Sequence, residues 1–379
     1  MGRKRLLFLN LLIGVIIYLE KPILPNYLQL YNIDVQYSTY LFASLSFFIM
    51  IFAPFWGDIG DIKGRKGVLI VAVTGMAASQ FVFGYASTLW IMVVSRCIQG
   101  VFLSGVVVSF MAYFNDNSTE ANRARLISLN IAFIGLGIAL GSLIGGAIGQ
   151  ILPLSTIYFI QSVLFLILGL VIHYIYPKSY LLIDEKRQYV FNLFKNIRRV
   201  SVMGLLPGML LTMTFSVGIQ VVMNYLEFYL SYIEFNVLEI GAYVFGLSII
   251  GVIGNATITH KLLDRFNEFK LLVITLVIGG ISLLLTAVYP AIGLFSFMLI
   301  FALVYNKFKP ITTQIIHEKA SDEQGVALGV RETLIHFGML VGSIVGGLLI
   351  ANPISIFYFS SIIMFICALG FNVLRLRAQ

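Results

Sequence analysis

The chain has 379 residues, of which 59% are hydrophobic and 11% are charged, and its mean hydropathy is +0.95. So few polar side chains cannot cover a soluble surface, which indicates that lipid is the main solvent of the chain. The formal net charge of +8 could suggest nucleic-acid binding. Most of the basic residues are instead grouped at particular loops between apolar segments, so we expect no nucleic-acid partner.

Apolar segments long enough to cross a bilayer recur along the whole sequence. A crossing helix needs about 20 mainly apolar residues, because each residue rises about 1.5 Å through a hydrocarbon layer about 30 Å thick. We predict an all-α membrane protein with twelve transmembrane helices in two six-helix, pseudo-symmetric bundles: residues 6–29, 38–58, 67–87, 88–114, 124–150 and 154–176, then 202–229, 238–260, 270–289, 291–315, 325–350 and 353–374. The predicted domains are an N-terminal bundle over 1–176, a linker over 177–200 and a C-terminal bundle over 201–379.

The basic residues outside the predicted crossings all fall at one set of helix ends. Because basic loops are retained on the cytoplasmic side during insertion, we expect both termini and the linker to be cytoplasmic. The linker is rich in charged and aromatic residues, which predicts a short amphipathic helix on that membrane surface. The expected location is the cytoplasmic (inner) membrane of a bacterium, with several crossings.

The fifth and eleventh predicted crossings each contain a row of glycines. Gly137, Gly141, Gly145 and Gly146 recur as glycines at a constant offset of 201. Glycines four residues apart let another helix backbone approach closely, so tight packing alone would explain either row. The matching positions of the two rows also indicate that the halves arose by duplication, as in many transporters.

Three segments carry a resemblance to a known family. Residues 57–66 read GDIGDIKGRK and resemble the G-x-x-x-D-x-x-G-[RK]-[RK] signature of the major facilitator superfamily. Residues 96–100 read RCIQG, similar to the R-x-x-Q-G pattern of the same family. The glycine row from 137 to 146 resembles the G-x-x-x-G-P-x-x-G-G motif of the drug:proton antiporter branches, with Ser142 in place of the proline.

The resemblance implies a transporter whose two halves rock about a central site. We expect no cofactor and a monomeric state. It also implies that Asp116 joins Arg65 in a network at the loop of residues 57–66. The residues expected to control the conformational change are Gly57, Asp61, Gly64, Arg65, Lys66, Asp116, Gly137, Gly141, Gly145 and Gly146.

Charged and titratable residues inside the predicted crossings predict a polar cavity, because a charge buried in lipid is costly unless it is paired or hydrated. Their sum is positive, which favours an anionic or zwitterionic substrate, such as a siderophore-like metallophore or a drug. The resemblance implies that crossings 1, 4, 7 and 10 line this cavity. The expected cavity residues are Lys21, Arg96, Gln99, Gln220, Asn224, Lys307 and Arg331.

Two of these choices leave alternatives open. Lys307 is preferred to Lys309, whose long side chain could instead reach the headgroup layer from a position nearer the helix end. Gln220 and Asn224 share a helix face, and they could bind substrate or only pack against a neighbouring helix.

A buried carboxylate is the expected carrier of a coupled proton, because burial can bring its titration near neutral pH. Glu20 is the first candidate, since it lies mid-crossing beside Pro22. A structural ion pair between Glu20 and a lysine is the alternative interpretation. Glu332 and His336, four residues apart, form a second candidate relay.

The main functional hypothesis is a proton-coupled exporter of a small molecule that works by alternating access. The alternative within the same fold is a proton symporter that takes up a small organic anion or a sugar. A membrane enzyme or a non-transporting receptor is a distant alternative, because the sequence has no H-E-x-x-H, G-x-S-x-G or P-loop motif. The expected partners are therefore the bilayer, a small-molecule substrate and protons.

Overall fold

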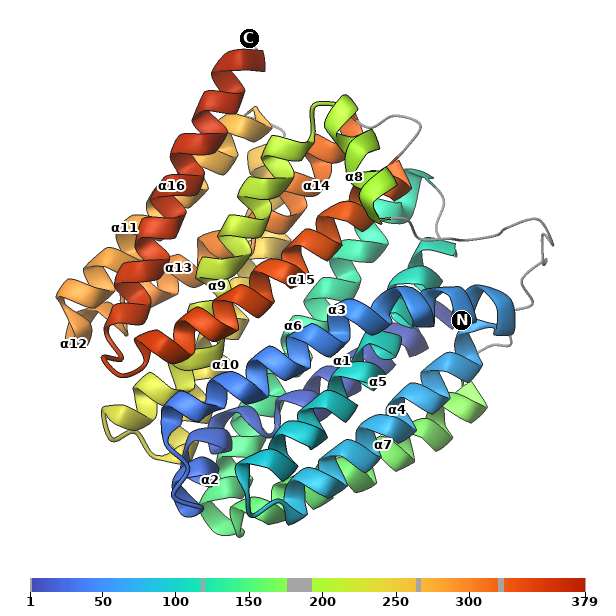
Figure 1. Cartoon of the computed structure of the whole chain (residues 1–379), viewed down its shortest axis with the longest axis vertical. Coiled ribbons are helices and arrows are strands. Elements are labelled where there is room, and N and C mark those ends of the chain that lie inside the picture. The colour runs from blue at the N-terminus through green and yellow to red at the C-terminus, as the bar shows by residue number, and fades with distance from the viewer. Residues whose placement is uncertain (1, 117–119, 176–192, 264–266, 320–323, 379) are drawn as a thin grey trace. The chain divides into compact units, whose positions relative to one another are not determined.

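The computed structural model describes residues 2–116, 120–175, 193–263, 267–319 and 324–378, and these are almost entirely helical (Figure 1). The first half contains α1 (Gly2–Tyr18), the short 3₁₀ helix η1 (Lys21–Ile23), α2 (Leu24–Leu30), η2 (Val35–Tyr37), α3 (Ser38–Lys63), α4 (Arg65–Tyr85), α5 (Leu89–Asp116), α6 (Glu120–Ile151) and α7 (Leu154–Ile175). The second half contains α8 (Leu193–Val202), α9 (Leu206–Tyr232), α10 (Val237–Leu263), α11 (Glu268–Val288), α12 (Pro290–Gly293), α13 (Phe297–Tyr305), α14 (Phe308–Lys319), α15 (Gln324–Leu349) and α16 (Ser355–Ala378).

Eleven segments of the described residues are long and apolar enough to cross a membrane. The remaining predicted crossing, residues 291–315, is divided among α12, α13 and α14. Pro310 has no N–H to donate to the carbonyl of Asn306, and the helix is interrupted between Tyr305 and Phe308. The amide of Lys307 instead bonds back only three residues, to the carbonyl of Val304 at 3.1 Å. With this broken helix as the twelfth crossing, the predicted all-α fold is confirmed.

The first crossing is also interrupted, at Glu20. Pro22 and Pro25 lack the N–H groups that would bond the carbonyls of Tyr18 and Lys21 in a regular helix. The amides of the next residues turn back instead, so that those of residues 23 and 24 donate to the carbonyl of Glu20 at 3.2 and 3.1 Å. Glu20 is therefore held in a turn between α1 and α2, inside a segment that is otherwise apolar enough to span a membrane.

The described residues form two compact units. The first unit contains those of 1–190 and 230–248, and the second contains those of 191–229 and 249–379. Residues 230–248 group with the first half because α10 packs against α6. A Cβ atom added at Gly146 would lie 3.1 Å from the Cα of Gly241, so both glycines are needed for this approach.

The core of the first unit is formed by α1, α4, α5 and α7, whose buried aliphatic and aromatic side chains pack together. Around it, α3 packs along α5, and α1 packs along α6. In the second unit, α11 packs along α16 and against α13.

The amphipathic helix α8 covers the end of α15 in the second unit. Its apolar residues Ile197 and Val200 pack against buried residues that include Ala327, whereas Arg198 and Arg199 are exposed. The predicted amphipathic helix is thus present over 193–202. Residues 177–192 of the predicted linker lie outside the described residues.

The two glycine rows make similar helix contacts in the two units, except that Gly346 meets the ring of Tyr225 where Gly145 meets backbone. In the first unit, Gly137 and Gly141 lie against the backbone of α1 and Gly145 against that of Leu19 just after it, and an added Cβ would strike carbonyl oxygens. In the second unit, Gly338 and Gly342 lie against the backbone of α9 in the same way. The predicted role of these rows in close helix packing is confirmed.

Candidate functional site

A buried ion pair joins the interrupted first crossing to α5 in the first unit. The guanidinium of Arg96 donates from Nη1 to Oε1 of Glu20 at 2.6 Å and from Nη2 to Oε2 at 3.1 Å. Arg96 is 3% exposed and Glu20 is 5% exposed. Nη1 of Arg96 also donates to Oε1 of Gln99, one turn further along α5. A bidentate contact of this kind fixes the orientation of both side chains as well as neutralising their charges, because the two guanidinium nitrogens match the two carboxylate oxygens.

Aromatic rings surround this ion pair. The guanidinium of Arg96 lies 4.3 Å from the ring centre of Phe83, a cation–π contact. The ring of Tyr158 packs against Phe83 at 4.5 Å and against Tyr27 at 4.8 Å. The hydroxyl of Tyr27 donates to the carbonyl of Phe83 at 3.1 Å. These rings exclude bulk water from the pair, which strengthens its electrostatic attraction.

Lys21 does not pair with its neighbour Glu20. Its ammonium nitrogen lies 5.1 Å from the ring centre of Phe42, on α3. The alternative of a Glu20–lysine ion pair is therefore not what the structure contains, and Arg96 is the partner instead. Adjacent residues on a helical segment point in different directions, which separates Lys21 from the carboxylate.

The loop of residues 57–66 is shaped by its glycines. Gly64 ends α3 with φ of +88°, a conformation that side chains rarely adopt. Arg65, which begins α4, is 8% exposed and packs over Gly60, where an added Cβ would lie 2.9 Å from its Nη1 atom. The side chains of Asp61 and Asp116 lie outside the described residues, so the expected network around them stays a prediction.

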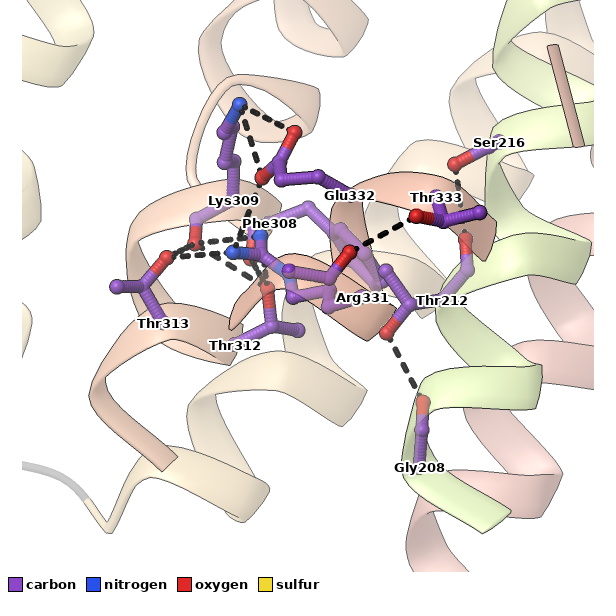
Figure 2. Close-up of polar contacts among 11 residues, drawn as sticks. Gly208, Thr212, Ser216, Phe308, Lys309, Thr312, Thr313, Arg331, Glu332 and Thr333 are labelled. Atoms are coloured by element: carbon purple, nitrogen blue, oxygen red, sulfur yellow. Dashed lines mark hydrogen bonds and ion pairs between the residues drawn. The ribbon is translucent and has the colours of Figure 1, made fainter. Parts of the chain in front are cut away.

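Another buried arginine lies in the second unit, where α15 meets α14 (Figure 2). Arg331 donates to the hydroxyls of Thr312 and Thr313 at 2.9 Å each, and to the carbonyl of Lys309 at 3.2 Å. Its side chain is 1% exposed, whereas that of neighbouring Glu332 is 39% exposed. Glu332 lies 3.6 Å from Nη1 of Arg331 and 3.3 Å from the ammonium of Lys309.

Lys307 and Lys309 lie two residues apart and point to different surroundings. Lys307 is 4% exposed and donates to the carbonyl of Gly254, on α10, at 3.2 Å. Lys309 is half exposed and pairs with Glu332. Lys307 is thus the buried cation of the two, at the interruption between α13 and α14.

The polar face of α9 is hydrogen-bonded to α15. Gln220 donates to Asn224 at 3.0 Å, and Asn224 donates to the hydroxyl of Ser343 at 3.0 Å. These bonds lie beside the close contact of Gly342 with α9, so they contribute to packing of this helix pair. His336, one turn after Glu332 on α15, is half-buried.

The structure brings the expected residues together in separate groups. Glu20, Arg96 and Gln99 meet in the first unit, and Arg331 meets Glu332 in the second. Sequence reasoning missed the aromatic rings around Arg96 and the threonine hydroxyls that bind Arg331. Among the described residues, no three His, Cys, Asp or Glu side chains come close enough to hold a metal ion.

A family model described as Major Facilitator Superfamily matches residues 6–321, which is most of the chain. The chain belongs to the Major Facilitator Superfamily.

Three similar relatives carry the names of resistance proteins. Multidrug resistance protein 2 of Bacillus subtilis (strain 168) is 23% identical over 89% of this chain and 84% of its own length. Quinolone resistance protein NorA of Staphylococcus aureus (strain MRSA252) is 24% identical over 91% and 87%. Multidrug resistance protein MdtG of Proteus mirabilis (strain HI4320) is 26% identical over 91% and 88%.

Solved structures of other transporters share this fold. The nucleoside transporter NupG superposes with a TM-score of 0.81 at 16% identity, over 98% of this chain and 99% of its own. The human organic anion transporter MFSD10 (TETRAN) superposes with a TM-score of 0.73 at 18% identity, over 98% and 100%. This superfamily chain is therefore a membrane-embedded secondary transporter of a small molecule and not an enzyme.

Proposed function

We propose that this superfamily transporter exports amphipathic organic molecules in exchange for protons, and that the Glu20–Arg96 pair couples the two movements. Relatives named for multidrug and quinolone resistance support the export of drug-like molecules. The observation that carries the coupling hypothesis is the buried, two-pronged ion pair at the interruption of the first crossing.

Protonation of Glu20 would change the balance of charge inside the first unit. Arginine stays charged at any physiological pH, so a neutral Glu20 leaves Arg96 without its counter-ion. An uncompensated charge in a dry environment is strongly unfavourable. A negative substrate group or a rearrangement of α1 against α5 would relieve that state, and this dependence links proton binding to the transport cycle.

The substrate class that we propose is anionic or zwitterionic, with an apolar body. Among the described residues, no carboxylate forms an ion pair with Lys21 or Lys307. These two lysines keep their charge available for a carboxylate or phosphate group on the substrate. Drugs that carry a carboxylate and carboxylate metal chelators both belong to this class and should be tested side by side.

The coupling test uses purified protein in proteoliposomes with an imposed pH gradient. Glu20→Gln should abolish gradient-driven accumulation of substrate and retain counterflow exchange, in which no net proton movement is needed. Glu239→Gln is the matched control, because Glu239 is exposed and only caps α10 through the amide of Asn236. Gradient-driven accumulation by Glu20→Gln at the wild-type rate would exclude Glu20 as the coupling residue.

The substrate class has a separate test in the same vesicles. Lys21→Ala and Lys307→Ala should each slow the transport of a carboxylate substrate more than that of its methyl ester. Equal rates for both compounds in wild type and variants would contradict the proposed preference. Reporter fusions at the two termini check the proposed cytoplasmic location of both ends.

A further inference from the structure

A pocket of about 230 Å³ lies within the second unit and shares one residue, Thr312, with the oxygen ligands of Arg331. Its walls come from the first turns of α9 and α11, the middle of α14 and the last turns of α16. Leu205, Met209, Ile315 and Phe371 are typical of its lining, and the two threonines Thr212 and Thr312 are its most polar side chains. The pocket is thus an apolar hollow at one end of this unit.

The two threonine hydroxyls are already engaged. Thr212 donates to the carbonyl of Gly208 at 2.9 Å, and Thr312 donates to that of Phe308 at 2.9 Å (Figure 2). The oxygen of Thr312 also accepts the hydrogen bond from Arg331. The hydroxyl hydrogens of both threonines are thus in use, and no side chain of the lining is charged, so hydrocarbon suits this pocket better than a charged group of a substrate.

The size of the pocket suits part of a lipid chain. An apolar cavity of about 150 Å³ already takes up benzene in a soluble protein. The residues next to the lining on the outer side of the helices are exposed and apolar: Leu210 follows Met209 and is 43% exposed, and Val373 precedes Leu374 and is 48% exposed. In a transmembrane helix such side chains face lipid, so the pocket lies beside the acyl chains of the bilayer.

Basic side chains follow the lining residues at the same end of the unit. Lys270 lies in the first turn of α11, the turn that supplies Phe269 to the wall, and its long side chain is exposed. Arg375 lies one helical turn after Phe371 of the wall, on the same face of α16, and its buried Nε atom has no hydrogen-bond partner among the described residues. Glu268 is the acidic side chain in the first turn of α11. The two exposed arginines of α8 precede the pocket residue Gly204 by a few positions and add to the positive charge.

We propose that this pocket binds one acyl chain of an anionic phospholipid, whose phosphate is held by Lys270 and Arg375. Apolar walls receive the chain, and the basic side chains beside the walls receive the charged headgroup. The lipid would fill the space between α9, α11 and α16 and hold these helices at their observed spacing. This inference does not depend on the direction of transport or on proton coupling.

The binding test uses the full chain in nanodiscs that contain a trace of phosphatidylglycerol with a photoreactive group in the middle of one chain. A phosphatidylcholine probe with the same chain reports binding without a net headgroup charge. After illumination, peptides that contain Met209 and Phe371 should carry the phosphatidylglycerol probe several-fold more than the phosphatidylcholine probe. Equal labelling of these peptides by both probes, or no labelling, would overturn the proposal.

Gly208→Leu fills the pocket without displacing the backbone, because a Cβ at this position would lie 3.9 Å from both Leu374 and Phe371. Labelling of the pocket peptides should fall to the background level of other lipid-facing helices. Gly329→Leu is the matched control, since an added Cβ there meets open space and the residue is not part of the pocket. Unchanged labelling in monodisperse Gly208→Leu protein would contradict the proposed site.

Charge removal gives a second, independent test that leaves the cavity intact. Lys270→Gln combined with Arg375→Gln should reduce phosphatidylglycerol labelling to that of phosphatidylcholine, without loss of phosphatidylcholine labelling. A retained preference for phosphatidylglycerol would exclude these two residues as the headgroup site. If a transported compound instead displaced the probe from the wild-type pocket, the pocket would belong to the transport route and the lipid proposal would be wrong.

Discussion

The two units each bury an arginine, and they satisfy it in different ways. Arg96 of the first unit is neutralised by the carboxylate of Glu20, 76 residues away in the sequence. Arg331 of the second unit bonds mainly to hydroxyl and carbonyl oxygens of α14, and the nearby Glu332 is shared with Lys309. The first arrangement is close to neutral, so one proton can disturb it. The second keeps a surplus positive charge that dipoles and a shared carboxylate hold in place.

The sharpest test of this contrast removes the counter-ion of Arg96. Glu20→Ala leaves the permanently charged Arg96 buried without a counter-ion, which should lower the free energy of unfolding by about 3–5 kcal/mol. Unfolding in mixed micelles, followed by circular dichroism, measures this change. The double variant Glu20→Ala/Arg96→Met should recover most of the loss, because the buried charge is gone. A double variant no more stable than Glu20→Ala would show that the charge balance is not what stabilises this region.

The glycine rows should respond alike in the two units. Gly141→Ala and Gly342→Ala each place a methyl group against a backbone carbonyl of the facing helix, and each should cost about 1–3 kcal/mol of unfolding free energy. Gly246→Ala provides the control, because its added Cβ meets open space and alanine favours a helix. Unequal losses at Gly141 and Gly342, measured under the same conditions, would argue against equivalent packing of α1 with α6 and α9 with α15.

Removal of Arg331 should lower the unfolding free energy less than removal of Glu20, which leaves Arg96 buried and unpaired. In Arg331→Met the two threonine hydroxyls still donate to carbonyls of their own helix, so the expected loss is about 2 kcal/mol. Arg331→Lys should recover little of it, because an ammonium cannot reach both hydroxyls as the guanidinium fork does. Recovery of wild-type stability by Arg331→Lys in the same unfolding assay would contradict this geometry.

The smallest effect is expected at the partly exposed pair of Lys309 and Glu332. Lys309→Gln should change the unfolding free energy by about 0.2–1 kcal/mol, because solvent screens such pairs. The effect should shrink as salt is added. An effect as large as that of Glu20→Ala would contradict the partial exposure of this pair.

The crossings could be predicted because a run of about 20 apolar residues has few other stable states. The spacing of three between Arg96 and Gln99 also predicts that both side chains lie on one face of α5. The partner of Arg96 could not be predicted in this way. It depends on the turn at Glu20 and on the register between α1 and α5, which neither segment encodes by itself.

Local sequence carries even less information on the second unit. Arg331 is bound by Thr312 and Thr313, two residues that carry no motif and lie on another helix. Pro310 indicates an interruption of the tenth crossing, but not that the next turn supplies the ligands of an arginine. The expected loop network of Asp61 and Asp116 stays a prediction that the described side chains do not address.

The turn that holds Glu20 has one more consequence. Glu20 lies two residues after Tyr18, the last residue of α1, so its carboxylate links the carboxyl end of that helix to Arg96 of α5. The carbonyls at such an end carry a partial negative charge equivalent to about half an electron. In the proposed coupling, protonation of Glu20 would loosen the link between this end of α1 and α5, and release of the proton would restore it.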